Sequence, residues 1–139
     1  MIDRVLVPMD ESEMAEEALR YALEVHRDAE ITVLHVVGEP SPMMGKAVGL
    51  ALEDDVEGAG EKDAFPVLEK ARKLADDCDV QIETDVGYGS PAKVIVERAD
   101  VFDAIVIGRH SSSLIERLLL GNVAERVAEG ASISVTIVR

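Results

Sequence analysis

The feature that most constrains the fold is the regular return of short apolar runs, each separated from the next by a helix-forming or loop segment. The runs cover residues 2–8, 30–37, 80–86, 104–108 and 134–138. Runs that are apolar almost throughout are typical of strands covered on both faces. Five strands alternating with helices predict an α/β fold, Rossmann-like, with an open, mostly parallel five-stranded sheet and helices on both faces. The 139 residues contain no linker or repeat, so we expect a single domain over residues 1–139.

Helices are predicted between these runs, over residues 12–28, 66–77, 91–101 and 123–129. Asp10 begins a stretch with the spacing of a capping box, which opens the first helix. The second helix is expected to begin at about Pro66, because a residue that precedes proline disfavours the helical conformation, with a kinked helical turn upstream of Pro66 as the alternative. Ser90 is expected to cap the third helix, with Pro91 in its first turn. Residues 38–60 are predicted to be mainly loop, and residues 114–120 are helix-prone.

Charge and cysteine content narrow the class of partner. The chain has 28 acidic and 14 basic side chains, a net charge of −14, which repels nucleic acid and anionic membranes. No apolar run approaches the roughly 20 residues that span a bilayer, so we expect a cytoplasmic protein. Cys78 is the single cysteine, and its acidic neighbours disfavour a reactive thiolate. The histidines His26 and His35 are predicted to lie on a helix surface and in the packed core, respectively.

The topology predicts where a ligand would bind. In open parallel sheets, ligands bind beyond the carboxyl ends of the strands, where the strand order reverses. The residues that follow the predicted strands are Met9 and Asp10, Val36 and Val37, residues 87–89 and residues 108–113.

One of these segments has the character of an anion site. Gly108 would let backbone amides approach an anion without a Cβ in the way. Gly121 and Asn122 precede a predicted helix, whose N-terminal amides and dipole favour negative charge. In this acidic chain, residues 109–115 contain no acid, and Arg109 and Arg117 are basic.

The same residues carry a resemblance to a known family. Gly108-Arg109-His110-Ser111, followed after nine residues by Gly121-Asn122, resembles the G-x2-G-x9-G-[S/T] nucleotide-binding signature of the universal stress protein family. The blocks at residues 5–10, 34–37 and 89–91 also lie where that family places similar residues. The resemblance covers essentially the whole chain. Ser111 replaces the second glycine of the signature, and Asn122 replaces its Ser or Thr.

The resemblance implies an adenine nucleotide alpha hydrolase-like fold and a site for ATP or another adenine nucleotide, with Mg²⁺ or Mn²⁺. Asp10 would address the ribose and Val36 the adenine, while Asp10 also serves the helix that it precedes. The remaining residues implied at the site are Pro8 and Met9 in the pocket lining, Ile107 and Gly108 beside base and ribose, and His110, Ser111, Gly121, Asn122 and Val123 around the phosphates.

No motif for dedicated catalysis accompanies this site. The chain lacks a GxxxxGK[ST] phosphate loop, a G-x-S-x-G elbow and zinc-ligand spacing. We therefore expect a binding module rather than a dedicated enzyme. The resemblance implies that this module acts in the stress response, with the nucleotide controlling conformation, dimer state or interaction with an unidentified protein partner. The resemblance implies a homodimer that pairs through residues 134–138, where Ser134 stands in place of the family's frequent proline. Two alternatives stay open: a nucleotide-free interaction protein with an eroded pocket, and a slow ATP-hydrolysing or adenylate-handling enzyme.

Overall fold

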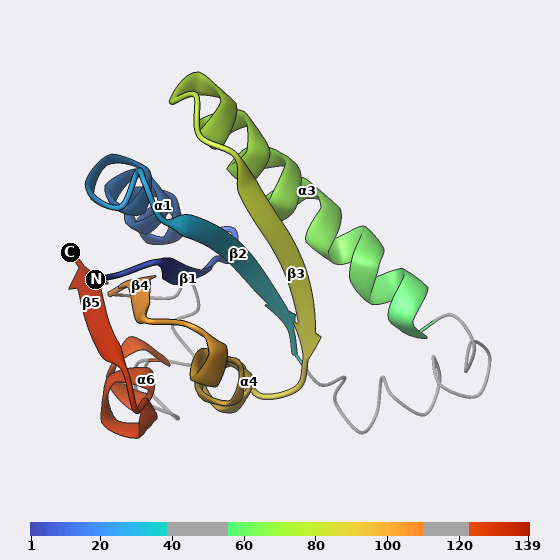
Figure 1. The fold of residues 1–139 in the computed structure, drawn as a ribbon. Helices are drawn as coiled ribbons and strands as arrows, with labels where there is room; N and C mark the ends of the chain where they lie inside the picture. Colours follow the sequence, from blue (N-terminus) through green and yellow to red (C-terminus); the bar gives the residue numbers. More distant parts are fainter. Residues whose placement is uncertain (39–55, 110–122) are drawn as a thin grey trace.

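The computed structural model describes residues 1–38, 56–109 and 123–139 (Figure 1). Its sheet has five strands in the order β3-β2-β1-β4-β5, and every pairing between neighbours is parallel. The strands are β1 (Arg4–Pro8), β2 (Glu30–Val37), β3 (Ile82–Tyr88), β4 (Ala104–Gly108) and β5 (Ser134–Val138). The α/β fold with a parallel five-stranded sheet is therefore confirmed. Its strand order reverses at β1, which lies between β2 and β4.

The described helices cover both faces of this sheet, as Figure 1 shows. They are α1 (Glu13–Val25), α3 (Val56–Asp77), α4 (Pro91–Arg98) with the short 3₁₀ helix η2 (Ala99–Val101), and α6 (Val123–Gly130). Helices α1 and α3 pack on one face, and α4 and α6 pack on the other. Within the described ranges, none of the helices has the length and apolar character that crossing a bilayer demands.

The core follows from the two-residue period of the strands. Successive side chains of a strand point to opposite faces of the sheet, so neighbouring residues enter different clusters. In β1, Val5 and Val7 join the cluster under α1 and α3, while Leu6 joins the cluster under α4 and α6. Both faces are apolar because both are covered, which explains why the strand sequences are nearly continuous apolar runs.

The first helix is capped by a different residue from the one expected. The Ser12 Oγ accepts a hydrogen bond from the Ala15 amide at 3.1 Å, which makes Ser12 the N-cap. The Asp10 Oδ1 instead accepts from the Ser12 amide at 2.8 Å, so Asp10 holds the turn that precedes the cap. The prediction that Asp10 begins the capping box is therefore wrong. Helix α1 also ends earlier than predicted, at Val25, with His26 half-buried as its C-cap.

The second long helix contradicts the predicted start at Pro66, because α3 begins at Val56 and carries Pro66 within it. Proline in a helix interior costs about 3 kcal/mol when it removes a hydrogen bond and clashes with the preceding turn. Burial on both sides of the proline offsets that cost: Ala64 is fully buried one turn before Leu68, and Pro66 itself faces solvent. Tertiary packing against β2 and β3 thus outweighs the local preference.

Smaller shifts concern β3 and α4. Strand β3 begins at Ile82 rather than at residue 80 because Asp79, with φ 55°, turns the chain after α3. The α-helical part of α4 ends at Arg98, and η2 continues it to Val101. Ser90 occupies the N-cap position, but its side chain makes no capping hydrogen bond, so that part of the prediction is wrong. Cys78 is a half-buried free thiol packed against the core.

Candidate functional site

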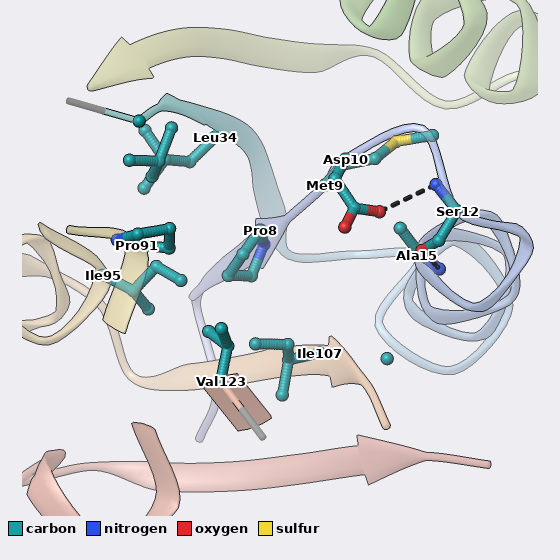
Figure 2. Close-up of a pocket in the computed structure, with 13 residues that line it drawn as sticks. Pro8, Met9, Asp10, Ser12, Ala15, Leu34, Pro91, Ile95, Ile107 and Val123 are labelled. Carbon is teal, nitrogen blue, oxygen red and sulfur yellow. Dashed lines mark hydrogen bonds between the residues drawn. The ribbon is translucent and has the colours of Figure 1, made fainter. Parts of the chain in front are cut away.

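A cleft opens at the carboxyl ends of the strands, beside β1, where the strand order reverses (Figure 2). This is the place where open parallel sheets bind ligands. Its volume is about 210 Å³, many times the roughly 10–15 Å³ that is enough to hold one water. The cleft therefore accepts a group much larger than a single water. The described residues that line it are Pro8, Met9, Asp10, Ser12, Ala15, Leu34, Val36, Gly38, Pro91, Ile95, Ile107, Gly108 and Val123.

Seven residues named from the sequence meet in this cleft, although they come from β1, the turn after it, β2, β4 and α6. They are Pro8, Met9, Asp10, Val36, Ile107, Gly108 and Val123. His110, Ser111, Gly121 and Asn122, which the resemblance places around phosphates, lie outside the described residues.

Six further lining residues were missed from the sequence, and some carried a usable signal. Leu34 precedes Val36 by two residues in β2, so both side chains point to the same face of the sheet. Pro91 and Ile95 are separated by one helical turn and present one face of α4 to the cleft. The signal was the start of a helix directly after a strand end, which places its first turn at the ligand edge.

The walls are apolar. Leu34, Ile95 and Ile107 are each at most 5% exposed, and Val123 is half-buried at the start of α6. Figure 2 shows Leu34, Pro91, Ile95, Ile107 and Val123 arranged around Pro8, with Asp10 and Ser12 to one side. Apolar walls with a few polar groups are typical of sites for small molecules, in which the polar groups orient the ligand.

Asp10 is the single charged side chain among the described residues that line the cleft. Its Oδ1 accepts from the Ser12 amide, and its Oδ2 accepts no hydrogen bond from the described part of the chain. An ionised carboxylate accepts through both oxygens, so Oδ2 keeps capacity for a hydroxyl donor. The turn that fixes the carboxylate thus leaves half of it available to a ligand.

Gly108 has a packing role that its place in the signature does not indicate. A Cβ built on this residue would lie 2.6 Å from the Met14 carbonyl oxygen and 3.1 Å from the Ala15 nitrogen. The first turn of α1 therefore packs directly against the backbone of β4. The next amide, that of Arg109, donates to the Val138 carbonyl at 2.9 Å and extends the pairing of β4 with β5. Glycine is needed here for helix–strand contact, whatever else approaches it.

Comparisons with known proteins extend over the whole chain. The family model described as "Universal stress protein family" matches residues 1–139. Universal stress protein MJ0531 of Methanocaldococcus jannaschii is 35% identical over 143 residues, which cover 98% of this chain and 81% of that protein.

Solved structures of similar proteins share the fold. Universal stress protein UspA from Lactobacillus plantarum superposes with a TM-score of 0.73 at 27% identity, over 99% of this chain and 98% of that one. A universal stress protein crystallised in complex with cAMP gives a TM-score of 0.73 at 25% identity, over 99% and 97% of the two chains. The likeness therefore includes the elements that form the cleft.

Proposed function

The chain belongs to the universal stress protein family, and we propose that its cleft binds ATP or another adenine nucleotide. The bound nucleotide would control conformation, dimer state or contact with a protein partner in a stress response. The observation that carries the proposal is the cleft itself, with apolar walls and one carboxylate oxygen left without a described partner. The similar protein crystallised with cAMP supports an adenine nucleotide as the ligand class.

The described residues fit the nucleoside part of such a ligand. Leu34, Val36 and Ile107 offer apolar surface to the base, and Asp10 Oδ2 would accept a hydrogen bond from a ribose hydroxyl. Asp10 would then accept one hydrogen bond from the Ser12 amide through Oδ1 and one from the ligand through Oδ2. This pair of bonds would orient the sugar relative to β1.

The phosphate end of the ligand is proposed to lie at the start of α6. Helix α6 begins at Val123, which lines the cleft, so the positive end of its dipole lies at the cleft and favours phosphate. His110, Ser111, Gly121 and Asn122 are proposed to complete that end. Among the described residues no cluster of three or more His, Cys, Asp or Glu side chains could hold a metal. A divalent ion is therefore assigned to no described side chain.

We also propose that the chain forms a homodimer through β5. This strand is an outer strand of the sheet and pairs with β4 on one side. Val135, Thr136, Ile137 and Val138 are half-buried, and an unpaired apolar edge favours association with another strand. We place this function in the cytoplasm, where the free thiol of Cys78 would stay reduced.

A matched pair of variants tests the proposed site. Val36 lines the cleft and Val37, the next residue of β2, does not, although both are half-buried. Val36→Trp would fill the cleft, and we expect it to weaken nucleotide binding by about a hundredfold or more, equivalent to about 2.8 kcal/mol. Val37→Trp should leave the affinity within about twofold of the wild type. Calorimetric titration with ATP, AMP and cAMP, with and without Mg²⁺, gives the dissociation constants.

The same samples examined by sedimentation show whether the chain is a dimer and whether nucleotide changes its mass. A wild-type chain that binds none of the three nucleotides would support the nucleotide-free interaction protein instead. Equal binding by Val36→Trp would place the ligand elsewhere. Sustained release of ADP or AMP during the titration would favour the enzyme, and a monomer at micromolar concentration would remove the β5 dimer.

A further inference from the structure

His35 lies next to the cleft without lining it. It stands in β2 between Leu34 and Val36, which both line the cleft, so its side chain points to the opposite face of the sheet. There it is half-buried, and its Nδ1 lies 2.9 Å from the Met9 carbonyl oxygen. Met9 does line the cleft. The imidazole thus contacts the backbone of a residue that lines the cleft.

The chemistry of the contact fixes the direction of the hydrogen bond. A carbonyl oxygen can only accept, so Nδ1 of His35 must carry the hydrogen and donate it to Met9. Both the neutral Nδ1–H tautomer and the imidazolium ion carry that hydrogen.

Met9 is the first residue after β1, and it lines the cleft. Its amide donates to the Leu34 carbonyl at 2.8 Å, so β2 pairs with both backbone polar groups of Met9, once through a carbonyl and once through the His35 ring. Met9 is only 4% exposed. Asp10 is the next residue, and its carboxylate accepts a hydrogen bond from the Ser12 amide. The position of the Met9 backbone therefore determines where this turn begins.

We propose that His35 is a positioning residue of the nucleotide site, a role that rests on the function proposed above. Two other hydrogen bonds, from the Ser12 amide to the Asp10 carboxylate and from the Ala15 amide to the Ser12 hydroxyl oxygen, are made among cleft-lining residues themselves. Removing the imidazole would leave a buried carbonyl without its donor, which costs more than the bond itself contributes. Residues 9 and 10 would shift so that the Met9 carbonyl finds another donor, and the Asp10 carboxylate would lose its preorganised position.

Three variants separate positioning from general stability. His35→Leu removes the donor, while His35→Asn places an amide nitrogen at the same number of bonds from the backbone as Nδ1. Val86→Ala is the matched control, because Val86 stands opposite His35 in the register of β3 and packs on the same core cluster. We expect His35→Leu to raise the dissociation constant for ATP about fivefold to tenfold, His35→Asn to restore most of the affinity, and Val86→Ala to lower stability without changing affinity.

Hydrogen exchange of the nucleotide-free protein gives a second readout that does not depend on binding. The Ser12 amide, held by Asp10, should exchange faster in His35→Leu than in the wild type or in Val86→Ala after correction for global stability. Unchanged ATP affinity in His35→Leu would overturn the positioning role, as would an equal loss in Val86→Ala. If the wild type binds no nucleotide, the proposed function fails, and an unchanged Ser12 amide then overturns the positioning role separately.

Discussion

An aspartate binds backbone amides at each end of β1, Asp103 from the residue before β4 at the amino end and Asp10 from the turn after β1 at the carboxyl end, but the two carboxylates are paired to different extents. At the amino end, the Asp103 Oδ2 accepts from the amides of Asp3 and Arg4, both at 2.9 Å. The carbonyls of the same two residues accept from the amides of Glu30 and Asp103. At the carboxyl end, Asp10 accepts one amide through Oδ1, and its Oδ2 accepts no hydrogen bond from the described residues.

The difference shows that one strand has an end whose backbone groups are all paired and an end where a carboxylate oxygen pairs with no described residue. Each backbone N–H and C=O of Asp3 and Arg4 is paired, so these four groups are not left for a ligand. The two amide hydrogen bonds also lower the pKa of Asp103, because they favour its charged form. At the carboxyl end, the hydrogen bonds of the Met9 and Ser12 amides fix the backbone, while one oxygen of the Asp10 carboxylate pairs with no described residue. Rigidity without full pairing is what a binding site requires.

The largest effect is expected at Gly108, because the first turn of α1 packs directly against the backbone of β4 at this residue. Gly108→Ala would set a Cβ 2.6 Å from the Met14 carbonyl, a contact with backbone that cannot rotate away. We expect a loss of about 2–3 kcal/mol in the free energy of unfolding, at the upper part of the range for overpacking. Urea denaturation measures it.

Gly38→Ala is the control for that substitution, because Gly38 also lines the cleft and a Cβ there meets nothing within 4 Å. Its stability should be unchanged or slightly higher, since alanine restricts the unfolded chain. Equal stability of the two alanine variants would show that α1 does not need the glycine.

Asp10→Asn should separate the two duties of that side chain. Asparagine retains an oxygen for the Ser12 amide but replaces Oδ2 with a donor, so the turn is kept and the ligand acceptor is lost. We expect stability within about 0.5 kcal/mol of the wild type and ATP affinity weaker by about tenfold to thirtyfold, or about 1.4–2 kcal/mol. Calorimetry and urea denaturation together check this. Lost stability with retained affinity would reverse the assignment.

The smallest effect is expected at Asp103 and depends on pH. Because its folded-state pKa lies below the ordinary value of about 3.9, the ionised group stabilises the fold above that value, and the contribution is lost as the pH falls through the folded pKa. Urea midpoints from pH 7 to pH 2 should show the stability advantage of the wild type over Asp103→Asn shrinking below about pH 4. Asp100→Asn, an exposed acid nearby, is the control. A constant difference across that range would contradict the assignment.

Much of the cleft followed from local sequence because strand ends can be located from apolar runs. Once the strands are parallel, their carboxyl ends share an edge, so the strand pattern is enough to expect Asp10, Val36 and Gly108 near one another, whereas Ile107 was expected there from the family resemblance. The capping residue of α1 could not be separated as easily. Asp10 and Ser12 both favour a cap, and the choice depends on where β1 releases the chain at Met9, which hydrogen bonds to β2 decide.

The sequence by itself determined the class of fold, the alternation of core faces and the edge of the sheet at which the cleft opens, because these depend on periodicities of two and 3.6 residues. The tertiary structure alone decided that α3 continues through Pro66, that Gly108 serves α1, and which oxygen of Asp10 is left for a ligand. Those outcomes depend on partners far away in the chain. The Asp3 amide, for example, finds its acceptor 100 residues later. Local patterns cannot specify such pairings, because the free energy that selects them comes from groups brought together only when the sheet forms.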